Sequence, residues 1–313
     1  MTSLYQDLGF GVAAVDTGFV RPQFDAAYLL IENGRAAFID TGPNAAVSRL
    51  LAALRAHGLA AEDIDYVIPT HVHLDHAGGA GLLMREAPNA KLVVHPRGAR
   101  HLIDPAALMA GVRAVYGEEV AARDYGELVP VPAERVVTTS DGMTIELGGR
   151  PLLFLDTPGH ARHHHCIWDE RSRGWFTGDT FGIAYPELYT AKGPYMVPAT
   201  APVQFDQEAL HASVKRLLDA RPERMYLTHY GAVYDVERCA AQFLAQVDAM
   251  AAAALALASA PDRHAQLKRA FADIYIAELR RHGSVREEET LYEVLATDIE
   301  LNAQGLGVWL DKR

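Results

Sequence analysis

The amino-acid sequence predicts an α/β fold whose sheets are covered by helices on their outer faces, followed by an all-helical C-terminal extension. In the first two-thirds of the chain, short runs rich in Val, Ile, Leu, Phe and Tyr alternate with stretches of helical periodicity. Strand pairs joined by tight turns and mixed with helices are typical of helix-covered sheets. From about Val236 onward the strand-like runs stop. We therefore expect a core at residues 1–235 and a helical extension at residues 236–313.

The strand-like runs of the core are bounded by Gly, Pro, Asp and Asn, which are typical turn residues. These runs lie at 11–17, 27–32, 36–39, 66–69, 91–94, 144–147, 152–155, 165–168, 175–177 and 225–227. Helical patterns separate some of them, at 45–57, 77–86 and 207–220. A hydrophobic content of 50% provides enough apolar side chains for a substantial core.

Three helices are expected in the extension. In the first, apolar residues recur near the spacing of an amphipathic helix, at Val236, Phe243, Val247, Met250 and Leu257. The second covers residues 261–282, and Gly283 is its expected C-terminal stop. The third begins at Ser284, because Ser284 and Glu287 form the pattern of a capping box.

Charge and cysteine content restrict the class of protein. The chain has 29 Lys and Arg against 40 Asp and Glu, a formal net charge of -11. This balance disfavours a nucleic-acid partner, although it does not exclude one local basic patch. Two cysteines, Cys166 and Cys239, predict no disulfide framework. The start resembles no signal peptide, and the alanine-rich run at 250–260 is too short to cross a bilayer, so we expect a cytoplasmic protein without a membrane partner.

The strongest chemical signal is the segment Thr70-His71-Val72-His73-Leu74-Asp75-His76-Ala77-Gly78-Gly79, which directly follows an apolar run. Residues two apart in an extended segment point to the same side, so His71 and His73 are placed to bind one ion. As the chain turns into a helix, Asp75 and His76 face a second position. Such a pattern arises by chance in roughly one sequence of this composition in a thousand. Its alternative is a polar loop of hydrogen-bonded histidines, and the metal-site interpretation is favoured.

This segment resembles the metallo-β-lactamase superfamily, and the resemblance extends over about residues 10–235. Four further motifs follow apolar runs in the order expected for the family: Asp40-Thr41-Gly42, Leu155-Asp156-Thr157-Pro158-Gly159-His160, Phe176-Thr177-Gly178-Asp179 and Tyr226-Leu227-Thr228-His229-Tyr230-Gly231. The resemblance implies a four-layer αββα sandwich. It also implies two metal ions, the first bound by His71, His73 and His160, the second by Asp75, His76 and His229, with Asp179 bridging both. These nitrogen and oxygen donors suit zinc, iron or manganese, and zinc is the first expectation.

Several residues near these motifs have two interpretations each. Asp40 either orients a ligand histidine by a hydrogen bond or only forms a turn before glycine. His163 and His164 either contact substrate or replace a ligand, or they have a structural role or support a ligand from outside the centre, and we favour the latter pair of roles. Aromatic residues in the segment 181–204 either line an apolar pocket or pack beneath the helices; these are Phe181, Tyr185 and Tyr195.

The resemblance also implies a mechanism. Two metals about 3.5–4 Å apart hold a bridging water, supply hydroxide near neutral pH, and polarise the scissile carbonyl or phosphoryl oxygen. Asp75 can ligate a metal while it accepts a hydrogen bond from the nucleophile, so it is the candidate that orients hydroxide.

The composition of the second metal position indicates the substrate class. Asp179 and His76 distinguish the chain from zinc β-lactamases that have a Cys in this position, and they favour the branch that contains glyoxalase II-like thioesterases, lactonases, phosphodiesterases and tRNA-processing nucleases. The excess of acidic over basic residues argues against the nucleases. A helical addition also follows the core in glyoxalase II, but these helices contain no clear basic cluster for a glutathione carboxylate.

We therefore expect hydrolysis of a small ester-like substrate, either a thioester or a lactone. The alternatives are a phosphodiesterase that acts on a small phosphate ester, and a regulatory protein that retains the metal-binding fold and acts through a partner. The C-terminal helices either cover the site or form a homodimer.

Overall fold

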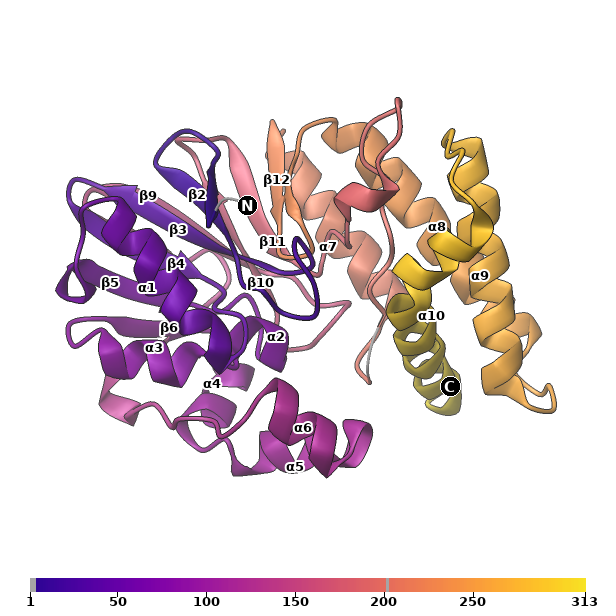
Figure 1. Ribbon diagram of the computed structural model, residues 1–313, viewed down its shortest axis with the longest axis horizontal. Coiled ribbons are helices and arrows are strands. Elements are labelled where there is room, and N and C mark those ends of the chain that lie inside the picture. The colour runs from indigo at the N-terminus through magenta and orange to yellow at the C-terminus, as the bar shows by residue number, and fades with distance from the viewer. Residues whose placement is uncertain (1–3, 201–202) are drawn as a thin grey trace.

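Two β-sheets pack face to face, and helices cover the outer face of each sheet, which produces four layers in the order α, β, β, α (Figure 1). This computed structural model describes residues 4–200 and 203–313. The expected four-layer sandwich and its helical C-terminal region are confirmed.

The first sheet has seven strands that follow one another in chain order. They are β1 (Tyr5–Asp7), β2 (Val12–Asp16), β3 (Ala26–Glu32), β4 (Arg35–Ile39), β5 (Ile64–Ile68), β6 (Lys91–Val94) and β7 (Val136–Thr138). Neighbours are antiparallel from β1 to β4 and parallel from β4 to β7. The parallel half places the ends of β4 and β5 at the same edge of the sheet.

The second sheet has six strands in the order β13-β12-β11-β10-β9-β8. They are β8 (Thr144–Leu147), β9 (Arg150–Asp156), β10 (His165–Asp169), β11 (Gly174–Gly178), β12 (Arg224–Leu227) and β13 (Gly231–Val233). All pairs are antiparallel except β11 with β12. Because β9 and β11 are both antiparallel to β10, the strands β9, β11 and β12 all point in one direction.

Side chains along the strands of the first sheet point alternately to its two faces, so the sheet has one apolar layer on each face. In β2, Val12 and Ala14 face the second sheet, whereas Ala13 and Val15 face the covering helices. Successive side chains of a strand point to opposite faces, so a strand covered on both faces is apolar throughout. This explains why β2 and β4 read as nearly continuous apolar runs.

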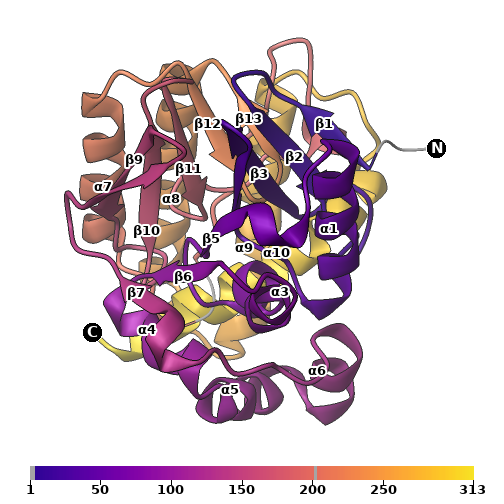
Figure 2. The same ribbon diagram turned by 90° about the vertical axis from the view of Figure 1, so that its left-hand side faces the viewer.

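Helices α1, α3 and α4 pack their apolar faces on the first sheet, and α5 and α6 lie below them (Figure 2). Their bounds, with the short α2, are α1 (Val47–Ala56), α2 (Leu74–Ala77), α3 (Ala80–Glu86), α4 (Pro96–Ile103), α5 (Ala106–Tyr116) and α6 (Glu118–Asp124). Single 3-10 turns occur at Asn44–Ala46, Ala61–Asp63, Ala133–Arg135 and Pro186–Leu188. The sequence did not predict α4 to α6, because Gly98, Gly111 and Gly117 lie within or between these helices.

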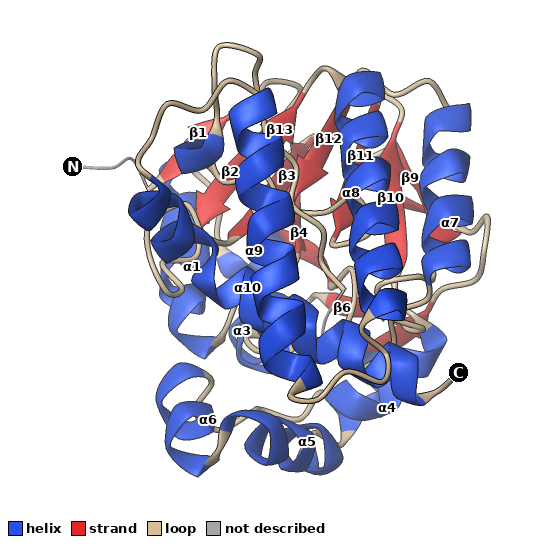
Figure 3. Cartoon of the chain, turned by 90° about the vertical axis from the view of Figure 1, so that its right-hand side faces the viewer, coloured by secondary structure: helices blue, strands red, loops and turns tan. Residues whose placement is uncertain are grey.

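The outer face of the second sheet is covered by α7 and α8, and α9 and α10 pack beyond them (Figure 3). These helices are α7 (Gln207–Asp219), α8 (Val236–Ala256), α9 (Arg263–Arg281) and α10 (Glu288–Asp311). By length and composition alone α8 is long and apolar enough to cross a membrane, a property that core helices of soluble proteins share. Here one face of α8 contributes Phe243, Val247 and Met250 to the core.

The junction between α9 and α10 differs from the prediction. Gly283 has a φ of 97°, and Ser284 N donates to Leu279 O at 2.8 Å, so α9 ends as expected. The last helix, however, begins at Glu288 and not at Ser284. The predicted capping box is wrong because the Ser284 hydroxyl accepts a hydrogen bond from Arg286 N, within the loop itself.

Candidate metal centre

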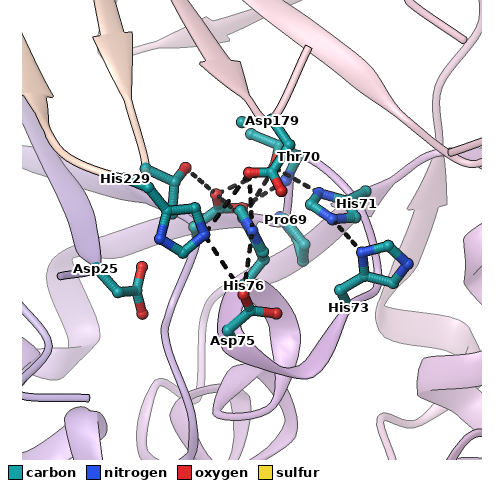
Figure 4. Close-up of polar contacts among 12 residues, drawn as sticks. Asp25, Pro69, Thr70, His71, His73, Asp75, His76, Asp179 and His229 are labelled. Atoms are coloured by element: carbon teal, nitrogen blue, oxygen red, sulfur yellow. Dashed lines mark hydrogen bonds and ion pairs between the residues drawn. The ribbon is translucent and has the colours of Figure 1, made fainter. Parts of the chain in front are cut away.

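The expected ligands follow the ends of four strands that meet along one edge of the sandwich. Four of them follow β5, and the others follow β9, β11 and β12: His71, His73, Asp75 and His76, then His160, Asp179 and His229. The side chains converge in the space where the two sheets come together (Figure 4). The ligand turn is also held to the turn after β4, because Gly79 N donates to Gly42 O at 2.8 Å.

Three imidazoles form the first group of donors. His73 Nδ1 lies 2.8 Å from His71 Nε2 and 3.0 Å from His160 Nε2. Burial and the neighbouring imidazoles hold the pKa of both His71 and His73 well below the usual range. These rings are therefore neutral near pH 7. One shared proton cannot satisfy three converging nitrogens, so lone pairs remain available for a cation.

Asp75, His76 and His229 form the second group. Asp75 Oδ2 lies 3.7 Å from His76 Nε2 and 3.4 Å from His229 Nε2. Burial opposes the charged form of Asp75, but His76 and His229 outweigh it and lower the pKa of this carboxyl. Asp75 is thus an anionic donor beside two imidazoles.

Asp179 joins the two groups. Its Oδ2 lies 3.5 Å from His160 Nε2, and its Oδ1 lies 3.2 Å from His76 Nε2 and 3.7 Å from His229 Nε2. Both Asp179 Oδ1 and His76 Nε2 are buried without a hydrogen-bond partner among the described residues. Buried polar atoms are rarely left unsatisfied, so these atoms fit a centre with one cation in each group and a carboxylate between them.

The other nitrogen of three ligand rings is held by a hydrogen bond. His76 Nδ1 lies 2.8 Å from Asp40 Oδ2, His160 Nδ1 lies 2.9 Å from Ala199 O, and His229 Nδ1 lies 2.9 Å from Phe24 O. Each acceptor fixes the tautomer, so that Nε2 presents its lone pair to the centre. For Asp40, the structure places the side chain where the orienting role requires it.

The three consecutive histidines after the His160 turn lie in different surroundings. His164 is buried, its Nδ1 lies 2.9 Å from Thr157 Oγ1, and Asp179 N donates to its Nε2 at 3.3 Å. It thus positions the backbone of Asp179. His165 Nε2 donates to Pro69 O at 2.9 Å, away from the centre. His163 borders the cavity described next, and its Nδ1 is buried without a partner in the described part of the chain.

The donors form the floor of a cavity of about 380 Å³. Its walls are predominantly apolar and come from α5, from Ile183 and Tyr185, from residues 198–199 and 203–204, and from α10. Leu108, Val112, Ile183 and Leu301 are among the lining side chains. The last helix of the chain therefore forms part of the wall opposite the ligands.

Comparisons with known proteins agree with this geometry. The family model of the metallo-beta-lactamase superfamily matches residues 20–229, well over half of the chain. The chain belongs to the metallo-β-lactamase superfamily. A superfamily member from Sulfurisphaera tokodaii, metallo-beta-lactamase fold-containing protein ST1585, is 27% identical over 180 residues, which cover 55% of this chain and 62% of the relative. Its crystal structure superposes with a TM-score of 0.66 at 23% identity, over 95% of this chain and 98% of the other.

Two other similar proteins widen the comparison. The superfamily protein TTHA1429 from Thermus thermophilus superposes with a TM-score of 0.66 at 24% identity, over 93% of this chain and 95% of the other. The atrochrysone carboxyl ACP thioesterase of Aspergillus fumigatus is 28% identical over 166 residues, which cover 52% of this chain and 42% of the relative. The regions matched by sequence thus span less than two-thirds of the length of ST1585 and of the atrochrysone carboxyl ACP thioesterase.

The aromatic residues of the segment 181–204 are divided between the cavity and the core of this superfamily member. Tyr185 lines the cavity, and its ring stacks on Phe24 at a centroid distance of 5.3 Å. Phe181 and Tyr195 are not lining residues, which corrects their status as substrate candidates. Phe181 packs against Phe243 of α8, and the Tyr195 hydroxyl donates to Gln246 Oε1 at 2.7 Å.

Sequence reasoning missed several polar residues of the cavity wall, among them the buried carboxyl of Asp298 on α10. Its Oδ1 accepts a hydrogen bond from the Tyr185 hydroxyl at 3.3 Å, and its Oδ2 is buried without a partner among the described residues. Burial raises the pKa of this carboxyl to about 7. A sequence signal existed, because Asp298 and Asn302 are four residues apart on a face that also carries Leu295, Ile299 and Leu306.

Proposed function

We propose that this superfamily member is a binuclear metal-dependent hydrolase that cleaves a small ester-like substrate, a thioester or a lactone. One observation carries the proposal: Asp179 presents one carboxylate oxygen to each of two donor groups on the floor of an apolar cavity. Two of the relatives by sequence are named thioesterases, the atrochrysone carboxyl ACP thioesterase and thioesterase pkgB, which supports the thioester.

In this proposal every donor atom has a place. One divalent cation would be held by His71 Nε2, His73 Nδ1, His160 Nε2 and Asp179 Oδ2, the other by Asp75, His76 Nε2, His229 Nε2 and Asp179 Oδ1. Paired cations supply a hydroxide nucleophile near neutral pH and polarise the carbonyl oxygen under attack. We propose zinc, and a donor set of nitrogen and oxygen also accepts iron or manganese.

The side chains around the centre orient the reactants. The Asp75 side chain is 26% exposed and borders the cavity, so its carboxylate is positioned to accept a hydrogen bond from the attacking water. The apolar walls of α5 and α10 bind the acyl chain by removing its surface from water. His163 borders the same space, so its imidazole is placed to contact the substrate.

The test is a substrate panel with protein reconstituted separately with zinc, iron and manganese. Acyl thioesters, lactones and phosphodiesters are compared at equal concentration, and metal content is measured on the same samples. We expect close to two ions per chain and turnover of a thioester or a lactone. Asp179→Ala and His73→Ala should lower the metal content and abolish turnover with little loss of helical signal in circular dichroism.

Asp141→Ala is the matched control, because this Asp side chain is 53% exposed and lies outside the donor groups. It should retain metal and turnover. Preferential cleavage of phosphodiesters would replace the proposed substrate class. A metal-loaded chain that cleaves no member of the panel would contradict the proposal and favour a regulatory protein.

A further inference from the structure

A second pocket, of about 980 Å³, opens beside the catalytic cavity. The two share four lining residues: His101, His163, Val203 and Gln204. The side pocket is bounded by α4, by residues on both sides of His160, by residues 203–206 and by Lys312, directly after α10. A ligand lying across both spaces would thus have one end over the metal donors and the other in the side pocket.

Positive charge is concentrated in this side pocket. Its lining residues include Arg97, Arg100, Arg162 and Lys312, against a single acidic residue, Asp206. Asp206 is already engaged, because its Oδ1 accepts a hydrogen bond from Ala209 N at 3.0 Å at the start of α7. For a chain with a formal net charge of -11, this local excess of cations is unusual.

Three of the four cations donate hydrogen bonds to neutral partners. Arg97 Nη1 donates to Arg162 O at 3.3 Å, Arg100 Nε donates to His101 Nε2 at 3.3 Å, and Lys312 Nζ donates to Val203 O. Within residues 4–200 and 203–313, none of them forms an ion pair, and the nearby Asp156 faces His95 at 3.3 Å. Other arginines are neutralised, such as Arg150 by Asp169 and Arg216 by Asp141.

Three guanidinium groups in one concave pocket are suited to phosphate oxygens. Guanidinium is planar, permanently charged, and donates paired hydrogen bonds that match phosphate geometry. Arg162 lies two residues after the donor His160, so the side pocket adjoins the donor end of the cavity. The pocket is also much larger than one inorganic phosphate requires, which indicates an extended anion.

We propose that the side pocket binds the phosphate groups of the thiol portion of the substrate, so that the substrate is an acyl thioester of a phosphorylated thiol. This inference rests on the proposed hydrolase and specifies its substrate. The acyl chain would occupy the apolar cavity, the thioester would lie over the donors, and the phosphates would contact Arg97, Arg100 and Arg162. Water adds to the thioester carbonyl, the carbon–sulfur bond breaks, and the products are a carboxylic acid and the free phosphorylated thiol.

Equilibrium binding tests the side pocket without relying on turnover. The probe is desulfo-coenzyme A, which has the phosphates but no thiol to bind metal, and the comparison ligand is desulfo-pantetheine, which has neither. We expect the phosphorylated probe to bind at least about tenfold more tightly, and this advantage to shrink as salt is added. The triple variant Arg97→Gln/Arg100→Gln/Arg162→Gln should lose the advantage.

Arg269→Gln is the control for loss of a positive charge outside the pocket, because Arg269 is exposed on α9 and does not line the pocket. Equal affinity for the two probes, or an undiminished advantage in the triple variant, would overturn the proposal. A parallel assay compares kcat/KM for the same acyl group on pantetheine and on coenzyme A. Selective binding without any hydrolysis would refute the proposed enzyme and leave the anion site standing, whereas hydrolysis without phosphate preference would refute only the anion site.

The kcat/KM comparison also separates two sources of a phosphorylated thiol. A free coenzyme has several phosphates that can reach all three arginines, whereas the phosphopantetheine arm of a carrier protein has one. We expect acyl-coenzyme A to exceed acyl-phosphopantetheine in kcat/KM, and acyl-phosphopantetheine to exceed acyl-pantetheine. If the two phosphorylated thioesters were equal, a single phosphate would suffice and the extended anion would be refuted.

Discussion

Asp40 Oδ2 lies 2.8 Å from His76 Nδ1, although the two residues are 36 positions apart in the chain. The same carboxylate accepts hydrogen bonds from Thr70 N at 2.6 Å and from Thr228 Oγ1 at 2.7 Å. Asp40 therefore connects the ends of β4, β5 and β12 directly behind the metal donors. This contact orients a ligand ring from outside the centre.

Asp40→Asn should weaken metal binding without unfolding the chain. An amide nitrogen directed at His76 Nδ1 cannot accept its proton, and loss of such outer contacts lowers metal affinity roughly 10–100-fold. Competition with a chromophoric chelator measures the change, with Asp141→Asn as the surface control. An affinity equal to that of the parent chain would show that Asp40 serves only the turn.

Gly178→Ala should disturb the bridging carboxylate. Gly178 has a φ of 47°, and an added Cβ would lie 2.5 Å from Thr70 Oγ1 and 2.6 Å from His164 Nε2. Because both neighbours are packed behind the donors, we expect a loss of about 2–4 kcal/mol in the free energy of unfolding and a lower metal content. Urea denaturation and metal analysis measure the two effects.

Gly307→Ala is the matched glycine control for that experiment. Gly307 is inside α10, and nothing lies within 4 Å of its added Cβ. Alanine is the better helix former, so this variant should be more stable by up to about 1 kcal/mol. A Gly178→Ala variant with unchanged stability would mean that Thr70 and His164 move aside freely.

Asp298→Asn should remove a pH-dependent decrease in the free energy of unfolding. Burial raises the pKa of Asp298 to about 7, whereas an unfolded Asp titrates near about 4. Between these values the folded chain retains a proton that the unfolded chain releases, so the free energy of unfolding falls as the pH rises. The variant should match the parent near pH 4 and exceed it above pH 7 by up to about 4 kcal/mol.

Urea denaturation of the parent chain and of Asp298→Asn, with EDTA present at each pH, measures this difference in stability without interference from metal loss. Asn retains an acceptor for the Tyr185 hydroxyl, so the hydrogen bond at that position persists in the variant. Asp248→Asn, on a side chain that is 53% exposed, is the control and should show no such pH dependence. A variant that is less stable than the parent at pH 8 would contradict the prediction.

Removal of metal should lower the melting temperature reversibly. Ions that bind only the folded chain stabilise it by about 2.7 kcal/mol per site at 100 times the dissociation constant. For a chain of this size that corresponds to roughly 4 °C per site. Differential scanning calorimetry with EDTA, and then with excess zinc, measures the shift. Asp179→Ala should show almost none of it, and an equal shift in that variant would locate the stabilising ions elsewhere.

The expected ligands were identified by the resemblance of their motifs to the family, and each one follows a strand that ends at the same edge of the sandwich. Asp179 and His229 illustrate this, since β11 and β12 are parallel and end side by side. The local sequence pattern also predicted correctly that α9 ends just before Gly283. It failed for Ser284, whose hydroxyl binds the loop and not the helix.

The cavity walls could not be predicted, because they depend on contacts between distant segments. Asp298 meets Tyr185 across 113 positions, and the segment 181–204 has too little regular structure to show which aromatic side chain points inward. The cations of the side pocket are similarly dispersed, from Arg97 to Lys312. A net charge of -11 conceals such a cluster, because composition carries no information about position.

The donors come from both halves of the sandwich: four follow β5 of the first sheet, and His160, Asp179 and His229 follow strands of the second. A cation shared between them is a crosslink between the sheets. By thermodynamic reciprocity, any force or mutation that separates the sheets must also lower the affinity for the ions. If the chain were cleaved in the connection between β7 and β8, one fragment would carry four of the ligands and the other three, and zinc would promote their reassembly.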